Sequence, residues 1–196
     1  MSPRTVAQNE EIRQERREQL LNTALKLFAE EGYEATSISK IAREAGVAKG
    51  LLYNYFASKE ELMEQIIYLA MEKMAGLFQT IRKEGDPKEV IKEALCLVRD
   101  SLKRDLTFWK FYKRFGSQLS DKKQLMDKVF QDMQEWVLRM NELMAKLGFR
   151  NPELETFKLS AIIDGITSDY VAMTEHYPLD AMIDYLVETY QDKSRL

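Results

Sequence analysis

The sequence predicts an all-α protein of about nine helices, and three observations support this fold class. Apolar residues recur at intervals of three and four along most of the 196 residues. No stretch alternates apolar and polar residues convincingly, as a half-buried strand would require. Several of the periodic stretches begin or end at a capping residue, a glycine or a proline, which are the usual boundaries of helices.

The first helix is predicted over residues 10–31. Its apolar face is formed by Leu21, Ala24, Leu25 and Phe28. Gly32 follows this face and provides a stop, because glycine readily adopts the left-handed conformation that ends many helices. Residues 1–9 show no apolar periodicity, so we expect them to form a mobile arm.

Residues 36–62 contain the pattern on which the functional prediction depends. Ser37 carries a hydroxyl that can accept a hydrogen bond from the first turn of a helix, and apolar residues follow it at helical spacing. Gly46 occupies the position of a left-handed cap, and the next helix restarts within about three residues. Two short helices joined by such a tight turn are typical of a helix-turn-helix.

The second helix of this pair is predicted to have one inward and one outward face. Leu52 and Phe56 lie one turn apart and can anchor the helix inward. The remaining surface is formed by Lys49, Gly50, Tyr53 and Asn54, with Tyr55 at its flank. We assign this surface to DNA.

A third helix is predicted to start directly afterwards. Ser58 and Glu61 have the spacing of a capping box. Lys59 lies in the first turn, where a cation is unfavourable to the helix dipole. A nearby phosphate would give this lysine a favourable partner.

The chain is weakly acidic overall but positive around the helix-turn-helix. Its net charge of -3 and its pI near 5.5 count against a general polyanion binder. Residues 1–65 carry nine Lys/Arg and eleven Glu, which favours an alternative in which a helical adaptor uses the motif for protein contacts. Between residues 37 and 59, however, four cations accompany one acid, so positive charge is focused where phosphates would approach.

Seven residues of this segment fit the pattern Gly-Val-x-x-x-x-Leu-Tyr-x-x-Phe-x-x-Lys-x-x-Leu, namely Gly46, Val47, Leu52, Tyr53, Phe56, Lys59 and Leu62. The segment therefore resembles the recognition region of the tetracycline-repressor (TetR) family. The upstream stretch ALKLFAEEGYEATSISKIA resembles the same family, so the specific resemblance covers about residues 20–69. One departure is Ala48, where many members carry a Ser or Thr cap, and we expect a deficit of ~1 kcal/mol in the stability of the following helix.

The resemblance implies a homodimeric transcriptional regulator that binds a palindromic double-stranded DNA operator and a small-molecule effector. Residues 10–58 would form the DNA-binding domain, and residues 59–196 the effector-binding and dimerisation domain. The residues predicted to contact DNA are Ser37, Ser39, Lys40, Lys49, Gly50, Tyr53, Asn54, Tyr55 and Lys59. A repressor released by a largely apolar effector is the expected mode of action, with an activator or a constitutive binder as alternatives.

The helix predicted over residues 59–83 joins the two domains. Its apolar residues recur without a break, and no Pro/Gly linker precedes the turn at residues 84–87. The domain boundary therefore lies within this helix or at its start. Motion in the second domain would be transmitted by a rigid rod rather than lost in a flexible tether.

The second domain carries a concentration of aromatic residues at positions 108–115, too many for one narrow helical face. A break is predicted at residues 116–120, followed by helices over 121–147, 151–176 and from 178 onward. The large, adaptable side chains that could line an effector pocket are Trp109, Tyr112, Phe115, Met133, Trp136, Met140 and Tyr170. Such a set forms either a core or a pocket, and the resemblance to effector-binding regulators favours the pocket.

A stripe of small residues runs along one face of the helix predicted over 151–176. The stripe consists of Ala161, Gly165, Ser168 and Ala172. Small stripes let two helices approach closely, and the resemblance implies that the last two helices form a dimer interface, to which Met182 and Leu186 of the final helix would contribute. The alternative is a contact within one chain.

Other classes of protein lack the residues that they need. The sequence has no Gly-rich phosphate loop and no Cys/His cluster, so we predict neither an enzyme nor a metal site or cofactor. His176 is the only histidine, and Cys96 lies among apolar neighbours, as a small core residue would. No apolar run approaches ~18 residues and the N-terminus is unlike a signal peptide, so we expect a cytoplasmic protein without a membrane partner.

Overall fold

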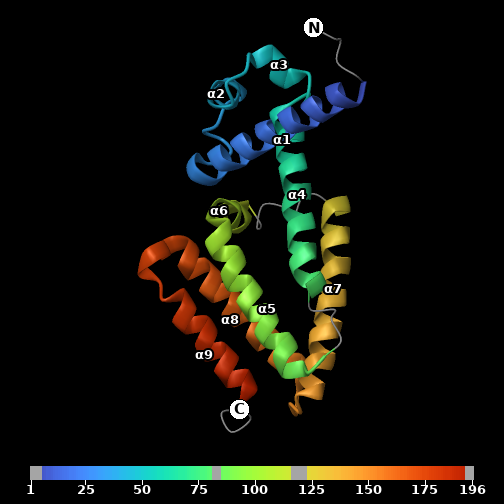
Figure 1. Ribbon diagram of the computed structural model, residues 1–196, viewed down its shortest axis with the longest axis vertical. Helices are drawn as coiled ribbons and strands as arrows, with labels where there is room; N and C mark the ends of the chain where they lie inside the picture. The colour runs from blue at the N-terminus through green and yellow to red at the C-terminus, as the bar shows by residue number, and fades with distance from the viewer. Residues whose placement is uncertain (1–5, 81–84, 116–122, 193–196) are drawn as a thin grey trace.

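The computed structural model describes residues 6–80, 85–115 and 123–192 (Figure 1). Within these ranges the chain forms nine α-helices, one short 3₁₀ helix and no strand, so the all-α prediction is confirmed. The helices are α1 (Val6–Glu31), α2 (Ile38–Glu44), α3 (Lys49–Tyr53), α4 (Lys59–Thr80), α5 (Pro87–Arg104), α6 (Leu106–Phe115), α7 (Lys123–Lys146), α8 (Pro152–Met173), the 3₁₀ helix η2 (Thr174–His176) and α9 (Leu179–Gln191).

The start of α1 differs from the sequence prediction. The helix begins at Val6, so the expectation of a mobile arm is wrong for residues 6–9, and residues 1–5 lie outside the described ranges. Residues 8–15 are all exposed, and a helical stretch that packs little against the rest of the chain shows no apolar face in its sequence. The predicted end of the 59–83 helix and the break at residues 116–120 also fall outside the described ranges.

The end of α8 is the second difference. The helix stops at Met173 rather than near His176, and Thr174 adopts a positive φ of 46°. This left-handed residue turns the chain into η2, after which Pro178 precedes α9. A positive φ at a β-branched residue is uncommon, and nothing in the local residue types predicts it.

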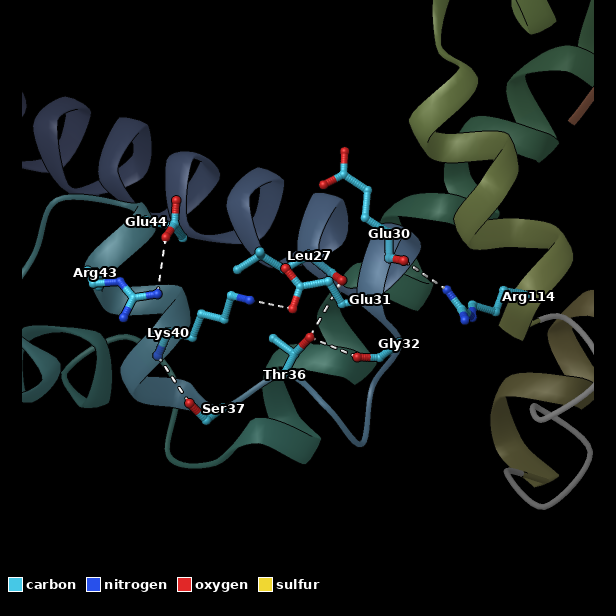
Figure 2. A network of polar contacts seen from close by, with 10 residues as sticks. All are labelled: Leu27, Glu30, Glu31, Gly32, Thr36, Ser37, Lys40, Arg43, Glu44 and Arg114. Atoms are coloured by element: carbon cyan, nitrogen blue, oxygen red, sulfur yellow. Dashed lines mark hydrogen bonds and ion pairs between the residues drawn. The ribbon is translucent and has the colours of Figure 1, made fainter. Parts of the chain in front are cut away.

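The helices α1, α2 and α3 gather at the top of Figure 1, and their buried side chains belong to the continuous apolar core of the molecule. The innermost side chains of this part of the chain include Leu20, Leu21, Ala24, Phe28, Ile41, Leu52 and Phe56. The connection from α1 to α2 is held by the fully buried Thr36, whose hydroxyl donates a hydrogen bond of 2.7 Å to the carbonyl of Gly32 (Figure 2). The position of α2 on α1 is therefore fixed by both apolar packing and a buried hydrogen bond.

The helix α4 leaves this unit and extends along α7 into the second half of the molecule (Figure 1). There α5 packs against α9, and α7 packs against α8. The buried Tyr190 of α9 donates a hydrogen bond of 2.7 Å to the carboxylate of Glu155 on α8, and burial together with this carboxylate raises the pKa of the tyrosine. None of the described helices is long and apolar enough to cross a membrane.

Candidate functional site

The segment from α2 to α3 has the geometry of a helix-turn-helix. The Ser37 hydroxyl accepts a hydrogen bond of 3.2 Å from the backbone N–H of Lys40, so the predicted cap of α2 is confirmed. Gly46 adopts a φ of +66°, the left-handed conformation that lets the chain turn directly after α2. The next helix starts at Lys49, and Ala48 supplies no side-chain cap.

The exposed face of α3 contains most of the residues predicted to approach DNA. Lys49, Gly50, Tyr53 and Asn54 are all exposed, whereas Leu52 is completely buried and anchors the helix. A side chain added at Gly50 would meet no atom within 4 Å, so this part of α3 presents bare backbone to its surroundings.

Two neighbouring residues, Tyr55 and Leu51, differ from this prediction. Tyr55 is only half exposed and packs against the core, so it lies at the edge of the surface. Leu51 is exposed and belongs to the surface, although sequence reasoning did not assign it. Leu51 was missed because an apolar residue next to the buried anchor Leu52 looks in sequence like another core residue.

The remaining predicted residues flank α3. Ser39 is exposed on α2, while Lys40 forms an ion pair with Glu31 at the end of α1 (Figure 2). Ser58 caps α4, since its hydroxyl accepts a hydrogen bond of 3.1 Å from Glu61 N–H, which confirms one half of the predicted capping box. The Glu61 carboxylate accepts its reciprocal bond of 2.6 Å from Ala57 N–H rather than from Ser58 N–H.

Lys59 has a partner that the sequence did not reveal. Its ammonium lies 4.0 Å from the centre of the Tyr33 ring, in a cation–π contact that gives a cation a favourable place near a helix N-terminus. The Tyr33 hydroxyl donates a hydrogen bond of 3.1 Å to Glu60. Partial burial and this carboxylate raise the pKa of Tyr33 to about 12.

A cavity of about 600 Å³ lies between α5, α6, α7 and α8. Four of the seven predicted effector residues line it, namely Trp109, Tyr112, Trp136 and Met140. The others do not lie in the described lining: Phe115 is buried against Phe111 with ring centres 4.9 Å apart, Tyr170 packs against the core, and the side chain of Met133 is outside the described part of the chain.

The cavity is apolar along most of its surface. Sequence reasoning missed the contribution of α5 and α8, whose lining residues are Ile91, Ala94, Leu95, Leu97, Val98, Phe157, Leu159, Ser160, Ala161, Ile163, Asp164 and Thr167. These residues have ordinary core spacing, so their sequence pattern cannot distinguish a cavity wall from a filled core.

Several polar groups in the cavity wall are paired within the chain. The buried Trp109 indole N–H donates to the Ser101 hydroxyl at 3.2 Å. The Thr167 hydroxyl donates to the carbonyl of Ile163 at 2.7 Å. Lys113 forms an ion pair with the carboxylate of Asp164, and burial together with that carboxylate raises the pKa of Tyr112.

The predicted dimer stripe lies on an exposed face of α8. Ala161, Gly165 and Ala172 are exposed, Ser168 is half exposed, and a Cβ atom added at Gly165 would meet no atom within 4 Å. Large apolar side chains on the same helix, Leu154, Phe157 and Met173, are also exposed.

The final helix meets the dimer prediction only in part. Met182 is half buried, whereas Leu186 is buried within its own chain. Tyr185 instead provides the large exposed side chain of α9. The helical period identified the apolar positions, but it did not show which of them the chain covers itself.

The two halves of the molecule meet where α6 contacts the end of α1 (Figure 2). The guanidinium of Arg114 donates hydrogen bonds to the carbonyls of Ala29 at 3.0 Å and Glu30 at 3.4 Å. These carbonyls belong to the last turn of α1, where intrahelical partners are missing and the helix dipole favours a cation. Arg114 therefore joins the helix that lines the cavity to the helix that supports α2.

Potential metal ligands do not gather in the described residues. The structure contains no group there of three or more His, Cys, Asp or Glu side chains that could hold a metal ion. Cys96 is half buried on α5.

These features define the class of protein as a helix-turn-helix transcriptional regulator. Residues 20–66 match the family described as bacterial regulatory proteins, tetR family. Residues 20–66 therefore form a helix-turn-helix domain of the tetR family, and the chain as a whole is similar to TetR-like transcriptional regulators.

Relatives of known sequence extend the match beyond the N-terminal unit. The uncharacterized HTH-type transcriptional regulator YuxN of Bacillus subtilis (strain 168) is 28% identical over 160 residues, which cover 80% of this chain and 54% of that protein. The chain spans about half the length, or less, of the first curated relatives that it matches.

Solved structures share the whole fold. A TetR-like transcriptional regulator from Rhodococcus sp. RHA1 superimposes with a TM-score of 0.73 at 24% identity, covering 97% of this chain and 96% of that chain. A transcriptional regulator from Saccharomonospora viridis in complex with choline gives a TM-score of 0.69 at 20% identity, covering 92% and 97%. At these identities the likeness shows the fold alone.

Proposed function

We propose that this TetR-family regulator is a homodimeric repressor that binds a palindromic operator and is released by a small, largely apolar effector. The exposed face of α3 carries the DNA-binding part of this proposal, because it presents Lys49, Gly50 and Tyr53 on a helix anchored by the buried Leu52. Residues 10–58 serve as the DNA-binding domain and residues 59–196 as the effector-binding and dimerisation domain.

Base and phosphate contacts are divided between two groups of residues in this proposal. Lys49, Gly50, Tyr53 and Tyr55 approach base edges, whereas Ser37, Ser39, Lys40, Asn54 and Lys59 contact phosphates. The bare backbone at Gly50 allows α3 to approach the groove closely. Lys40 and Lys59 exchange their partners within the chain, Glu31 and the Tyr33 ring, for phosphate oxygens.

Dimerisation occurs through α8 and α9. The exposed small residues of α8 and the apolar side chains beside them form an unpartnered face that a second copy can cover. Symmetric homodimers are the commonest assemblies, and a dimer presents two copies of α3 to two half-sites about 34 Å or a multiple apart.

The effector binds in the cavity of about 600 Å³, a volume within the usual range of about 300–1,000 Å³ for small-molecule sites. The neighbour from Saccharomonospora viridis holds choline, so this fold can accommodate a small ligand. Trp109, Tyr112, Trp136 and Met140 provide adaptable walls for an apolar molecule.

Coupling between the cavity and DNA runs through α6 as well as through the rod α4. Trp109 and Tyr112 line the cavity, and Arg114 on the same helix bonds to the end of α1. Displacement of α6 therefore moves the end of α1 and, through the buried Thr36 that bonds to the Gly32 carbonyl, α2. An effector acts only through its different affinities for the two arrangements, so operator DNA weakens its binding by the same factor.

The test is selection of genomic duplex fragments by the purified protein, followed by footprinting of the selected sites. A palindromic footprint bound by two copies, with affinity that falls as salt rises, supports the proposal. Lys49→Ala should change the preferred sequence, while Lys92→Ala on α5 should not. Absence of salt-dependent retention on duplex DNA would favour the helical adaptor, and operator binding that no small molecule changes would favour a constitutive binder.

A further inference from the structure

We propose that the cavity binds an amphipathic monocarboxylate, a molecule with one apolar body and one carboxylate, and that Lys113 holds the carboxylate. This inference rests on the proposed function and names the chemical class of its effector. It starts from an uneven distribution of charge. Lys113 and Asp164 are the only ionised side chains among the cavity-lining residues that the structure describes.

The deeply buried lining of the cavity is largely apolar. Ile91, Leu95, Trp109 and Leu159 are almost completely inaccessible to solvent. The exposed lining residues include Asp164, so the ion pair with Lys113 lies where the cavity approaches the surface. A ligand oriented along this direction places its apolar body inside and its polar group beside the ion pair.

Buried polar groups of the wall are already occupied. The Trp109 indole N–H donates to Ser101 at 3.2 Å, and the Thr167 hydroxyl donates to the Ile163 carbonyl at 2.7 Å. A ligand that displaced these bonds would leave buried groups unpaired, which is costly. The Lys113–Asp164 pair is the polar contact that a ligand can replace most readily.

The two members of this pair differ in their exposure, and this difference favours an anionic ligand. The side chain of Lys113 is 19% exposed, whereas that of Asp164 is 71% exposed. In the isolated subunit the Asp164 side chain is already mostly hydrated, so an incoming carboxylate can take its place and leave it to turn to water at little cost. Lys113 keeps a charged partner and the carbonyl of Asp164, which accepts its second bond at 3.2 Å.

A cationic ligand faces the opposite balance. By pairing with Asp164 it would take the charged partner of Lys113 and leave a mostly buried ammonium uncompensated, which is strongly unfavourable. A neutral apolar ligand would disturb neither residue but would gain no ionic contact. The order of affinity is therefore carboxylate, then neutral molecule, then cation.

The experiment compares decanoate, decanol and decyltrimethylammonium, which share one alkyl chain and differ in charge. Binding is followed by the fluorescence of Trp109 and Trp136, both of which line the cavity and are the 2 tryptophans of the chain. Decanoate should bind the wild-type protein most tightly. Lys113→Met should weaken the binding of decanoate by about tenfold or more and leave the binding of decanol unchanged, since methionine keeps the apolar stem without the charge.

Two further variants keep the test independent of folding. Lys113→Arg retains the cation and should retain the preference for decanoate. Asp164→Asn removes the competing carboxylate and should increase the affinity for decanoate by a few fold. The inference is overturned if decanoate binds the wild type and Lys113→Met equally, or if it does not bind at all. It is also overturned if decyltrimethylammonium binds the wild type more tightly than decanoate does and loses this binding in Asp164→Asn.

Operator binding separates this inference from the proposed function. If decanol and decanoate bind with equal affinity and both release the operator, the carboxylate inference is wrong and the effector-controlled repressor stands. If decanoate binding depends on Lys113 but leaves operator affinity unchanged, the carboxylate site is established and the proposed role of the cavity in regulation is wrong.

Discussion

The helix-turn-helix unit and the cavity unit bury side chains to a similar extent but use them differently. Leu21 on α1 and Leu95 on α5 are each 1% exposed. Both belong to the continuous apolar core of the molecule, but Leu95 also borders a cavity of about 600 Å³, whereas Leu21 does not line it. The first unit gives α3 one fixed position, and the second leaves room for a ligand at the expense of packing.

Matched truncations give the largest expected effect and test this difference directly. Leu21→Ala should destabilise the protein by about 3–5 kcal/mol, because it opens a new void in a filled core. Leu95→Ala should cost about 2 kcal/mol, because one side of this leucine already faces the cavity and makes fewer contacts. Chemical denaturation measures both, and equal losses would contradict the comparison.

Gly165→Leu sharpens the contrast between the closed core and the open face of α8. A Cβ atom added at Gly165 meets nothing within 4 Å and the position is exposed, so the isolated subunit should keep its fold. The leucine should block the close approach of a second α8. Because the operator is bound by the dimer, operator affinity should fall by at least about a hundredfold, which corresponds to ~2.7 kcal/mol. Analytical ultracentrifugation checks the oligomeric state, with Gly165→Ala as control. A variant that remains fully dimeric at micromolar concentration would rule out this interface.

Lys49→Ala tests whether the rigid unit reads sequence. Loss of a base contact should cost about 1–3 kcal/mol at one operator position and leave other positions unchanged. Lys59→Ala provides the contrast, since loss of a phosphate contact should weaken all sequences similarly and reduce the salt slope by about one. Binding to a library of operator variants at several salt concentrations measures both. A changed preference in Lys59→Ala with an unchanged salt slope would reverse the assignment.

Arg114→Met has the smallest expected effect and tests the connection between the two units. It removes the hydrogen bonds to Ala29 and Glu30 while keeping an apolar stem, so α6 should move α1 less effectively. The coupling between ligand and operator should decrease by about 0.5–2 kcal/mol, with little change in either affinity alone. Arg104→Met, at the exposed end of α5, serves as the control. If the coupling between ligand and operator binding is unchanged in Arg114→Met, it is transmitted through α4 rather than through α6.

The helix-turn-helix was predictable because local residues determine it. Ser37 caps a helix, Gly46 permits a left-handed turn, and Leu52 anchors α3, and each of these roles depends on near neighbours in the chain. The start of α1 was missed because residues 6–9 show no apolar periodicity, and helix propensity alone is a weak signal. The Lys59–Tyr33 contact joins residues that are distant in sequence, so no local pattern shows it.

The cavity was predictable only in part. The density of aromatic residues on α6 correctly indicated Trp109 and Tyr112, but Phe115 on the same helix faces the core instead. The walls contributed by α5 and α8 depend on how distant helices pack, and their residues look like ordinary core positions. The Lys113–Asp164 pair likewise depends on tertiary packing, since 51 positions separate its members.

The most direct test of the account measures decanoate binding to the free protein and to the protein saturated with its selected operator, by tryptophan fluorescence. The central claim is that occupation of the cavity opposes operator binding, so the operator should raise the dissociation constant of decanoate. Decanoate should raise the dissociation constant of the operator by the same factor, as thermodynamic linkage requires. Decanoate that binds free and operator-bound protein with equal affinity would contradict the claim.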